Sequence, residues 1–122
     1  MPLHKTAATA GLLLLAACGS PVVTPGTPVL LTDKQRETVV SFTRANLPDP
    51  DSAYFGMMRA TENDEGKTAV CGEFIGNGPE SDRPYRQTYF GYLDLTFYVW
   101  QVGDSESSRR TVQGLCSSAG LG

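Results

Sequence analysis

The first seventeen residues constrain the fold of this chain more than any other feature, because their layout is that of a secretory signal. A short polar start with His4 and Lys5 is followed by an apolar stretch from Ala7 to Leu15 and by the small residues Ala16 and Ala17. The apolar stretch is too short for a transmembrane helix, which needs about 20 residues. We therefore expect residues 1–17 to be removed on export. The rest of the chain then folds in an oxidising compartment.

The remaining residues, 18–122, have the size of one small domain with a net negative charge. Of the ten basic side chains in the sequence, Lys5 lies in the signal, so nine remain against 13 acidic ones. Because lysine and arginine form no cluster, this composition argues against a nucleic-acid partner. His4 is the only histidine of the sequence, so the exported part lacks the imidazole used in Ser/His/Asp catalysis, in Cys/His catalysis and in the commonest zinc sites. We expect no metal, no cofactor and no catalytic residue of these kinds.

The residues at the expected cleavage point, Leu15-Ala16-Ala17-Cys18, resemble the lipobox of bacterial lipoproteins. The resemblance implies that the Cys18 thiol carries a diacylglyceryl group, that cleavage occurs in front of it, and that its amino group is acylated as well. Two or more acyl chains anchor a protein stably, whereas one does so only marginally. Gly19 is not the aspartate that resembles an inner-membrane retention signal, so we expect an outer-membrane lipoprotein facing the periplasm, with the inner membrane as the other location. An ordinary signal peptide with an incidental cysteine is the alternative.

Once Cys18 carries lipid, Cys71 and Cys116 are the remaining thiols. In an oxidising compartment their default state is a disulfide. This disulfide would close a loop of 46 residues, counted from 71 to 116 inclusive, and stabilise the fold by about 4 kcal/mol on the chain-entropy model. Two buried free thiols, or a redox or metal site, are the alternatives.

A helix is predicted over residues 33–46, after an uncharged, proline-rich stretch over 18–31 that we expect to be a flexible tether. Thr32 and Gln35 have the spacing of a capping box, and Pro48 ends the helix. The apolar residues of the helix share one face, so we expect it to pack on a sheet.

Two strands joined by a polar turn are predicted at Phe55–Thr61 and Thr68–Ile75. Residues 76–86 are rich in glycine, proline and charge, which predicts a mobile surface loop. Strict alternation predicts one strand over Tyr92–Val102, and apolar spacing predicts a short C-terminal helix that ends before Gly120. The predicted fold is an α+β domain over 32–122: an amphipathic helix packed on a small antiparallel sheet of three to four strands, with the C-terminal helix held by the disulfide.

Three sequence segments are similar to those of small exported proteobacterial proteins that have no assigned function. The first is Asp49-Pro50-Asp51-Ser52-Ala53-Tyr54-Phe55, the second is Val70-Cys71-Gly72-Glu73-Phe74, and the third comprises the following loop, a hydrophobic strand and a late cysteine. The similarity covers about residues 35–118 and implies an exported α+β domain with a cysteine pair. Where that family pattern has an asparagine-rich, double-glycine segment, this chain has Asn77-Gly78-Pro79-Glu80.

A concentration of aromatic residues between residues 85 and 100 predicts either a core strand or a recognition surface. Tyr98 and Trp100 alternate with apolar residues, so they are either covered by a helix or exposed to a partner. Arg83 and Arg86 beside Tyr85 have the chemistry to hold an anionic glycan or phosphate. The candidate partner surface is Arg83, Tyr85, Arg86, Tyr89, Tyr98 and Trp100.

Three functions are compatible with these features. The first is a non-enzymatic, lipid-anchored envelope protein that binds an envelope protein or glycan through its sheet face or its 76–92 segment. The second is an envelope hydrolase that uses carboxylates such as Glu73, Asp94 or Asp51, which requires two of them to converge in one cleft. The third, an accessory lipoprotein of a secretion or conjugation apparatus, rests on analogy of class.

Overall fold

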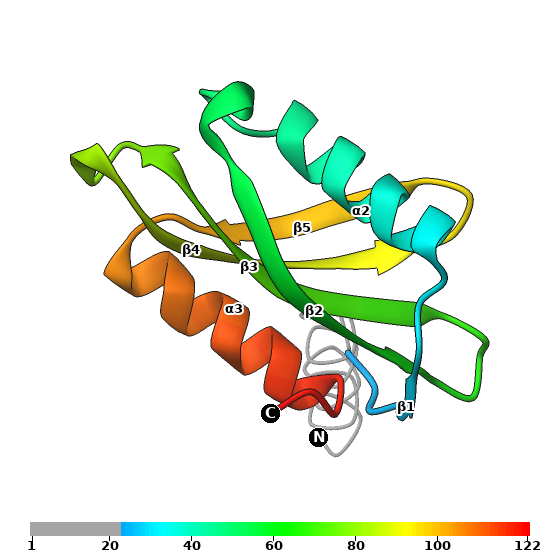
Figure 1. Cartoon of the computed structure of the whole chain (residues 1–122). Helices are drawn as coiled ribbons and strands as arrows, with labels where there is room; N and C mark the ends of the chain where they lie inside the picture. Colours follow the sequence, from blue (N-terminus) through cyan, green and yellow to red (C-terminus); the bar gives the residue numbers. More distant parts are fainter. Residues whose placement is uncertain (1–22) are drawn as a thin grey trace, which may run out of the picture.

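The computed structural model describes residues 23–122 and places them in a five-stranded antiparallel sheet with one helix on each face (Figure 1). The strands lie in the sheet in the same order as in the chain. The expected α+β class and antiparallel sheet are confirmed, but the expected three to four strands are five. The elements are β1 (Thr27–Val29), α2 (Asp33–Ala45), a 3₁₀ turn η1 (Pro50–Ser52), β2 (Tyr54–Glu62), β3 (Thr68–Gly78), β4 (Ser81–Leu93), β5 (Phe97–Gly103) and α3 (Glu106–Ser118).

Helix α2 begins and ends close to the residues that the sequence predicted. Thr32 Oγ1 accepts a hydrogen bond from the backbone N–H of Gln35 at 3.1 Å, and Gln35 Oε1 accepts one from the backbone N–H of Thr32 at 2.8 Å. The predicted capping box is therefore complete. Val39 and Thr43 are buried on the inner side of the helix, which packs over β4 and β5.

The predicted hairpin of two strands is confirmed as β2 and β3, which pair antiparallel. The side-chain oxygen of Asn63 accepts hydrogen bonds from the backbone N–H groups of Glu65 and Lys67, each at 3.0 Å. Gly66 has a φ of 79°, in the left-handed region that glycine adopts at low cost. These local contacts fix the turn between the two strands.

The prediction of a mobile loop over residues 76–86 is wrong, because β3 and β4 continue through these residues and leave a tight hairpin. Gln87 Nε2 donates a hydrogen bond to the carbonyl oxygen of Gly76 at 3.0 Å. The hydroxyl of Tyr85 donates to the carbonyl oxygen of Asp104 at 2.6 Å. Cross-strand pairing and these bonds outweigh the local preference of glycine and proline for a loop.

The prediction of one strand over Tyr92–Val102 is also wrong, because a turn separates β4 from β5. In that turn the backbone N–H of Asp94 donates to the carbonyl oxygen of Thr96 at 2.8 Å. Leu93 and Phe97 pair across the turn and are both buried in the cluster on the α2 side. The alternation of apolar and polar residues therefore runs through the turn without a break.

The prediction that the tether extends to residue 31 is wrong, because the last part of this segment belongs to the domain. Thr27–Val29 form β1 and pair with the last residues of β2. The backbone N–H of Gly26 donates to the carbonyl oxygen of Ala119 at 3.1 Å, and Val23 packs against the core on the α3 side. The domain therefore includes residues before residue 32, among them Val23, Gly26 and β1.

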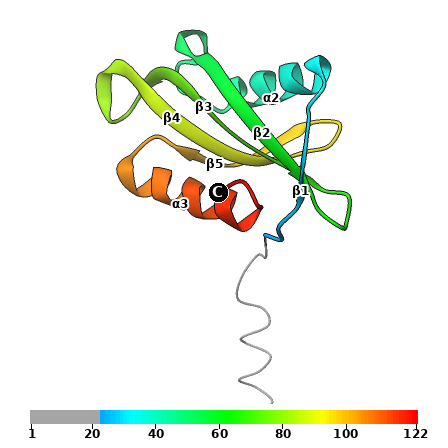
Figure 2. The same cartoon turned by 60° about the horizontal axis from the view of Figure 1, so that its bottom comes forward.

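Helices α2 and α3 lie on opposite faces of the sheet (Figure 2). Each face carries its own hydrophobic cluster under the helix. The α2 side is rich in aromatic rings: Phe55, Phe74, Tyr89 and Phe97 lie with centroids 5.2 to 6.4 Å apart. The α3 side is built mostly from smaller groups: Ala69, Cys71, Phe90, Val112, Cys116, Ala119 and Leu121 are buried there.

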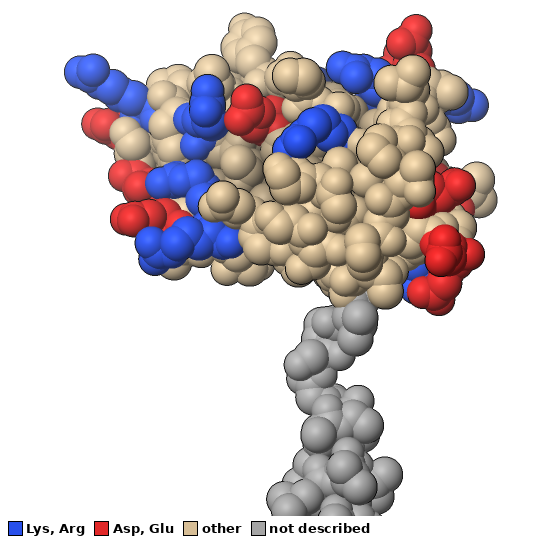
Figure 3. Space-filling model, turned by 90° about the horizontal axis from the view of Figure 1, so that it is seen from below, with Lys and Arg blue, Asp and Glu red and all other residues tan. Residues whose placement is uncertain are grey.

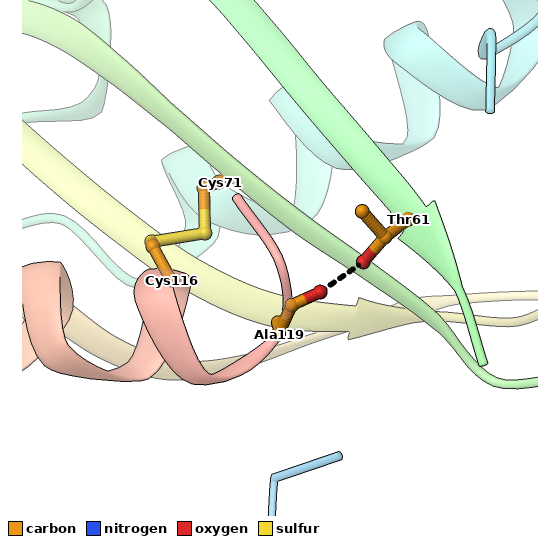
Figure 4. The surroundings of a disulfide bond; sticks show 4 residues. All are labelled: Thr61, Cys71, Cys116 and Ala119. Carbon is orange, nitrogen blue, oxygen red and sulfur yellow. Dashed lines mark hydrogen bonds between the residues drawn. A yellow bond between two sulfur atoms is a disulfide. The ribbon is translucent and has the colours of Figure 1, made fainter. Parts of the chain in front are cut away.

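Helix α3 is longer than predicted, but it carries the predicted disulfide. Cys71 on β3 and Cys116 on α3 are bonded, with their Cα atoms 6.1 Å apart. Close to this bond, Thr61 Oγ1 donates a hydrogen bond to the carbonyl oxygen of Ala119 at 2.7 Å (Figure 4). The end of α3 is thus joined to β3 by a covalent bond and to β2 by a buried hydrogen bond.

Candidate functional site

Three aromatic side chains, Tyr92, Tyr98 and Trp100, meet on the α3 side of the sheet, and we refer to them as the aromatic corner. The ring centroids of Tyr92 and Trp100 are 4.8 Å apart, and both rings contact the buried ring of Phe90 edge to face. A bulge positions the indole: Trp100 is the extra residue of β5 between two regular pairs with β4. Contacts with the buried ring of Phe90 therefore hold the rings of Tyr92 and Trp100 in place.

The aromatic corner is only partly covered by α3. Tyr98 is 62% exposed and Trp100 is 44% exposed. The sequence left open whether these side chains are covered by a helix or exposed, and the structure shows that both are partly exposed. Exposed aromatic side chains on a fixed support are typical of binding sites.

Polar groups surround the rings and form the wall of a shallow hollow. Asn63 Nδ2 donates a hydrogen bond to Thr24 Oγ1 at 3.0 Å, which ties the β2–β3 turn to the start of the described chain. Burial raises the pKa of Tyr92, and the negative charge of Glu65 raises it further. The phenol of Tyr92 is therefore protonated at neutral pH. Besides the aromatic corner, the residues lining the hollow are Thr24, Asn63, Glu65, Gly66, Lys67, Leu93 and Asp94.

The charged part of the predicted partner surface does not form one surface with the aromatic corner. Arg83 lies in the irregular part of β4, between the pairs Gly76–Tyr85 and Gly78–Ser81, whereas Arg86 pairs with Ile75. Arg86 Nε lies 3.6 Å from Glu73 Oε2, and Tyr85 is held by its hydrogen bond to Asp104. These three residues lie at the β3–β4 hairpin, at the other end of β4 from the aromatic corner.

The prediction that Tyr89 belongs to a partner surface is wrong. Its side chain is fully buried on the α2 side, among Phe55, Phe74 and Phe97. Burial raises its pKa, and its hydroxyl has no hydrogen-bond partner among the described residues. Tyr89 is a core residue.

The carboxylates that would serve a hydrolase do not converge. Asp51 lies in η1, which contacts β3 near Gly76, whereas Asp94 follows the end of β4 that pairs with Thr68. The length of β3 between these ends is on the order of 25 Å. Glu73 lies between them, paired with Arg86. Residues 23–122 also contain no group of three or more carboxylate, cysteine or histidine side chains that would hold a metal ion.

Charge is unevenly distributed on the α3 side, as Figure 3 shows. The end with the β3–β4 hairpin and the start of α3 carries both signs, with Arg109 paired to Glu80 and Arg110 to Glu106. At the opposite end Figure 3 shows several acidic side chains and a few basic ones. Between the two ends lies a broad uncharged surface, with charged side chains along one margin.

The signal, the lipobox and Cys18 lie outside the described residues. Within residues 23–122 no helix is long and apolar enough to cross a membrane. Anchoring of this chain therefore remains a prediction from its sequence.

The sequence predicted Tyr98 and Trp100 as surface candidates, but not the polar residues beside them. Asn63 and Lys67 belong to the polar turn predicted between the first two strands. The register that pairs Thr68 with Leu93 brings this turn next to the β4–β5 turn. The sequence signal for this proximity was the hairpin itself, since it fixes where β3 starts.

Comparisons with known proteins do not assign this chain to a group. No family model, no curated protein and no solved structure matches it.

Proposed function

We propose that this protein is a lipid-anchored, non-catalytic binding module of the cell envelope, and that the aromatic corner holds a saccharide chain. The observation that carries the proposal is the exposure of the Tyr98 and Trp100 rings beside a hollow with amide, carboxylate and ammonium groups. The anchor is the expected lipid on Cys18.

The chemistry of a sugar matches this surface. One side of a pyranose ring is a patch of C–H groups that stacks on an aromatic face, while the hydroxyl groups at its rim donate and accept hydrogen bonds. The Trp100 indole provides the face. Asn63, Glu65, Lys67 and Asp94 provide donors and acceptors around it. Small-ligand sites usually combine apolar and aromatic side chains with a few polar groups, and this hollow combines three aromatic rings with these four polar side chains.

The short connection to the anchor limits where such a ligand is found. Between the predicted lipid on Cys18 and Val23, which packs on the domain, there are only residues 19–22. A segment of this length spans at most about 17 Å. Thr24 lines the hollow, so the expected anchor would hold the site close to the membrane surface, where it is suited to a glycan that lies along that surface.

The fluorescence of Trp100 tests the proposal directly, because Trp100 is the only tryptophan in the sequence. The full-length protein in detergent is titrated with chitotetraose and with soluble peptidoglycan fragments. We expect saturable quenching or a spectral shift, and a Tyr98→Ala variant that binds about tenfold more weakly, equivalent to about 1.4 kcal/mol.

Tyr54→Ala is the matched control, since Tyr54 is also an exposed tyrosine but lies at the start of β2, away from the aromatic corner. Its affinity should equal that of the wild type. Unchanged fluorescence with every saccharide, or equal weakening by the two substitutions, would exclude the aromatic corner as a glycan site.

A further inference from the structure

The first part of strand β2 has a free edge, independent of the aromatic corner. One edge of β2 pairs with β3 along its length, but on the other edge β1 pairs only with Ala60–Glu62. The chain leaves the sheet after β1, where Leu30 is 98% exposed, and enters α2. Figure 1 shows β1 beside only the last part of β2. In the described part of the chain, residues 54–59 have no strand on that edge.

The backbone groups at this edge are available for a further strand. Alternate residues of an antiparallel strand direct their N–H and C=O groups to the same neighbour. Pro28 has no N–H and lies opposite Thr61, which fits the position whose backbone groups point away from the partner. The backbone N–H and C=O groups of Ala60 and Glu62 then point towards β1. Met58 is the next residue of β2 whose backbone groups point to this side, where no strand follows.

Grooves lie on both sides of this edge, because both helices pack mainly over β4 and β5. The α2-side groove is lined by the inner residues Phe55 and Met58 of β2 and by Val40 and Arg44 of α2. The α3-side groove is lined by Met57 and Arg59 of β2 and by residues of α3 including Val112 and Gln113. A strand added to this edge would direct alternate side chains into the two grooves.

Arg59 favours an acidic residue in that strand, because the other charged residues that line the α3-side groove, Glu73 and Arg109, are already paired with Arg86 and Glu80. Arg59 is exposed and takes part in no ion pair within residues 23–122, whereas Arg86, Arg109 and Arg110 are each paired with a glutamate. The α2-side groove has an apolar floor of Phe55 and Met58. An occupant with alternating apolar and acidic side chains therefore satisfies both sides.

A second copy of this chain fits the edge less well. Gly56 and Met57 form a bulge opposite Glu73, and bulges at sheet edges oppose regular pairing between two identical folded sheets. It would also bring two Arg59 side chains to one interface. A flexible extended segment adapts to the bulge more readily.

We propose that residues 54–59 of β2 bind an extended segment of a partner protein by strand addition, with apolar side chains on the α2 side and an acidic side chain next to Arg59. Main-chain hydrogen bonds supply affinity in this mode of recognition, and the alternate side chains supply specificity. The aromatic corner and this edge are then separate contacts for a glycan and for a protein.

The test uses the isotope-labelled full-length protein in detergent and a capped heptapeptide of alternating valine and aspartate. Amide resonances of residues 54–59 should shift on titration, and exchange of the Met58 amide proton should slow. Two N-methylated forms, one methylated on the valines and one on the aspartates, separate strand addition from side-chain binding. Because alternate N–H groups face the same side, one form should fail to bind and the other should bind.

Charge reversal tests the role of Arg59. Arg59→Glu should weaken the aspartate peptide about tenfold and favour a peptide with lysine in place of aspartate. Arg83→Glu on the β3–β4 hairpin is the matched control and should leave affinity unchanged. The proposal is overturned by the absence of shifts at millimolar peptide, by equal binding of both N-methylated forms, or by concentration-dependent dimers that protect Met58 without peptide.

Discussion

The two faces of the sheet are held together by different means. On the α2 side four aromatic rings pack in one hydrophobic cluster with residues of the helix. This cluster includes Val39 of α2 and Phe74 and Tyr89 of the sheet. On the α3 side the buried residues are fewer and smaller, and a disulfide and hydrogen bonds to Ala119 hold the helix. Packing of large apolar groups fixes α2, whereas covalent and polar links fix α3 on a face with less apolar surface to bury.

This difference explains why the candidate site is on the α3 side. A helix held by the Cys71–Cys116 bond does not have to cover the whole face in order to stay in place. It leaves Tyr98 and Trp100 partly exposed at one end of the sheet. The α2 face has no comparable exposed ring on its strands among the described residues, because its rings form the core.

The largest expected effect comes from removing the covalent link on the α3 side. Replacing Cys71 and Cys116 by alanine should lower the free energy of unfolding by about 4 kcal/mol on the chain-entropy model. Urea denaturation measures this loss, and hydrogen exchange should show that α3 loses protection before α2. Reductant should destabilise the wild type and leave the double variant unchanged. Equal loss of protection in both helices would contradict the difference between the faces.

A smaller effect is expected from overfilling the α2 side. A Cβ atom on Gly72 would overlap the buried ring of Tyr89, so Gly72→Ala should cost about 2 to 3 kcal/mol of stability. In Gly114→Ala, a matched change within α3, the new methyl meets no atom within 4 Å. It should stabilise the protein by about 0.5 to 1 kcal/mol. Thermal unfolding of both variants measures these two changes in stability. Similar effects of Gly72→Ala and Gly114→Ala would contradict the prediction.

The smallest effect is expected at the buried hydroxyl of Tyr89. Because this hydroxyl has no hydrogen-bond partner among the described residues, Tyr89→Phe should leave stability at pH 7 unchanged or raise it by up to about 1 kcal/mol.

The pH dependence of stability provides a second readout for Tyr89. Burial raises the pKa of Tyr89 above the value near 10 that it has in the unfolded chain. Its stabilising contribution is thus complete below pH 10 and is lost as the pH rises above 10. Tyr89→Phe should flatten this alkaline loss, with part of it kept by Tyr92, whose pKa is also raised. An alkaline limb identical to that of the wild type would show that the Tyr89 hydroxyl is not buried.

Local signals predicted the elements that depend on local contacts. Helix α2 was predicted from Thr32, Gln35 and Pro48, and the disulfide was predicted from two thiols in a chain expected to be exported. Strand β1 was missed because its partner is more than 30 residues away in sequence, and a proline argued for a tether. The β4–β5 turn was missed because the buried pair of Leu93 and Phe97 continues the alternation across it.

The site was predictable only where single side chains were informative. Tyr98 and Trp100 could be identified because they occur at polar positions of an alternating strand. Tyr89 could not be separated from them, since its burial depends on Gly72 of the neighbouring strand leaving room for the ring. The open edge of β2 follows from the shortness of β1, which only the strand register reveals.

The proposed function depends most on the predicted lipid anchor at Cys18, because this anchor would determine the compartment in which the disulfide forms and would hold the aromatic corner near a membrane. Metabolic labelling with a palmitate analogue, followed by membrane fractionation of the wild type and Cys18→Ser, tests it directly. The account predicts a labelled wild type in the membrane fraction and an unlabelled Cys18→Ser variant that is lost from it. An unlabelled wild type, or a Cys18→Ser variant that stays with the membranes, would contradict it.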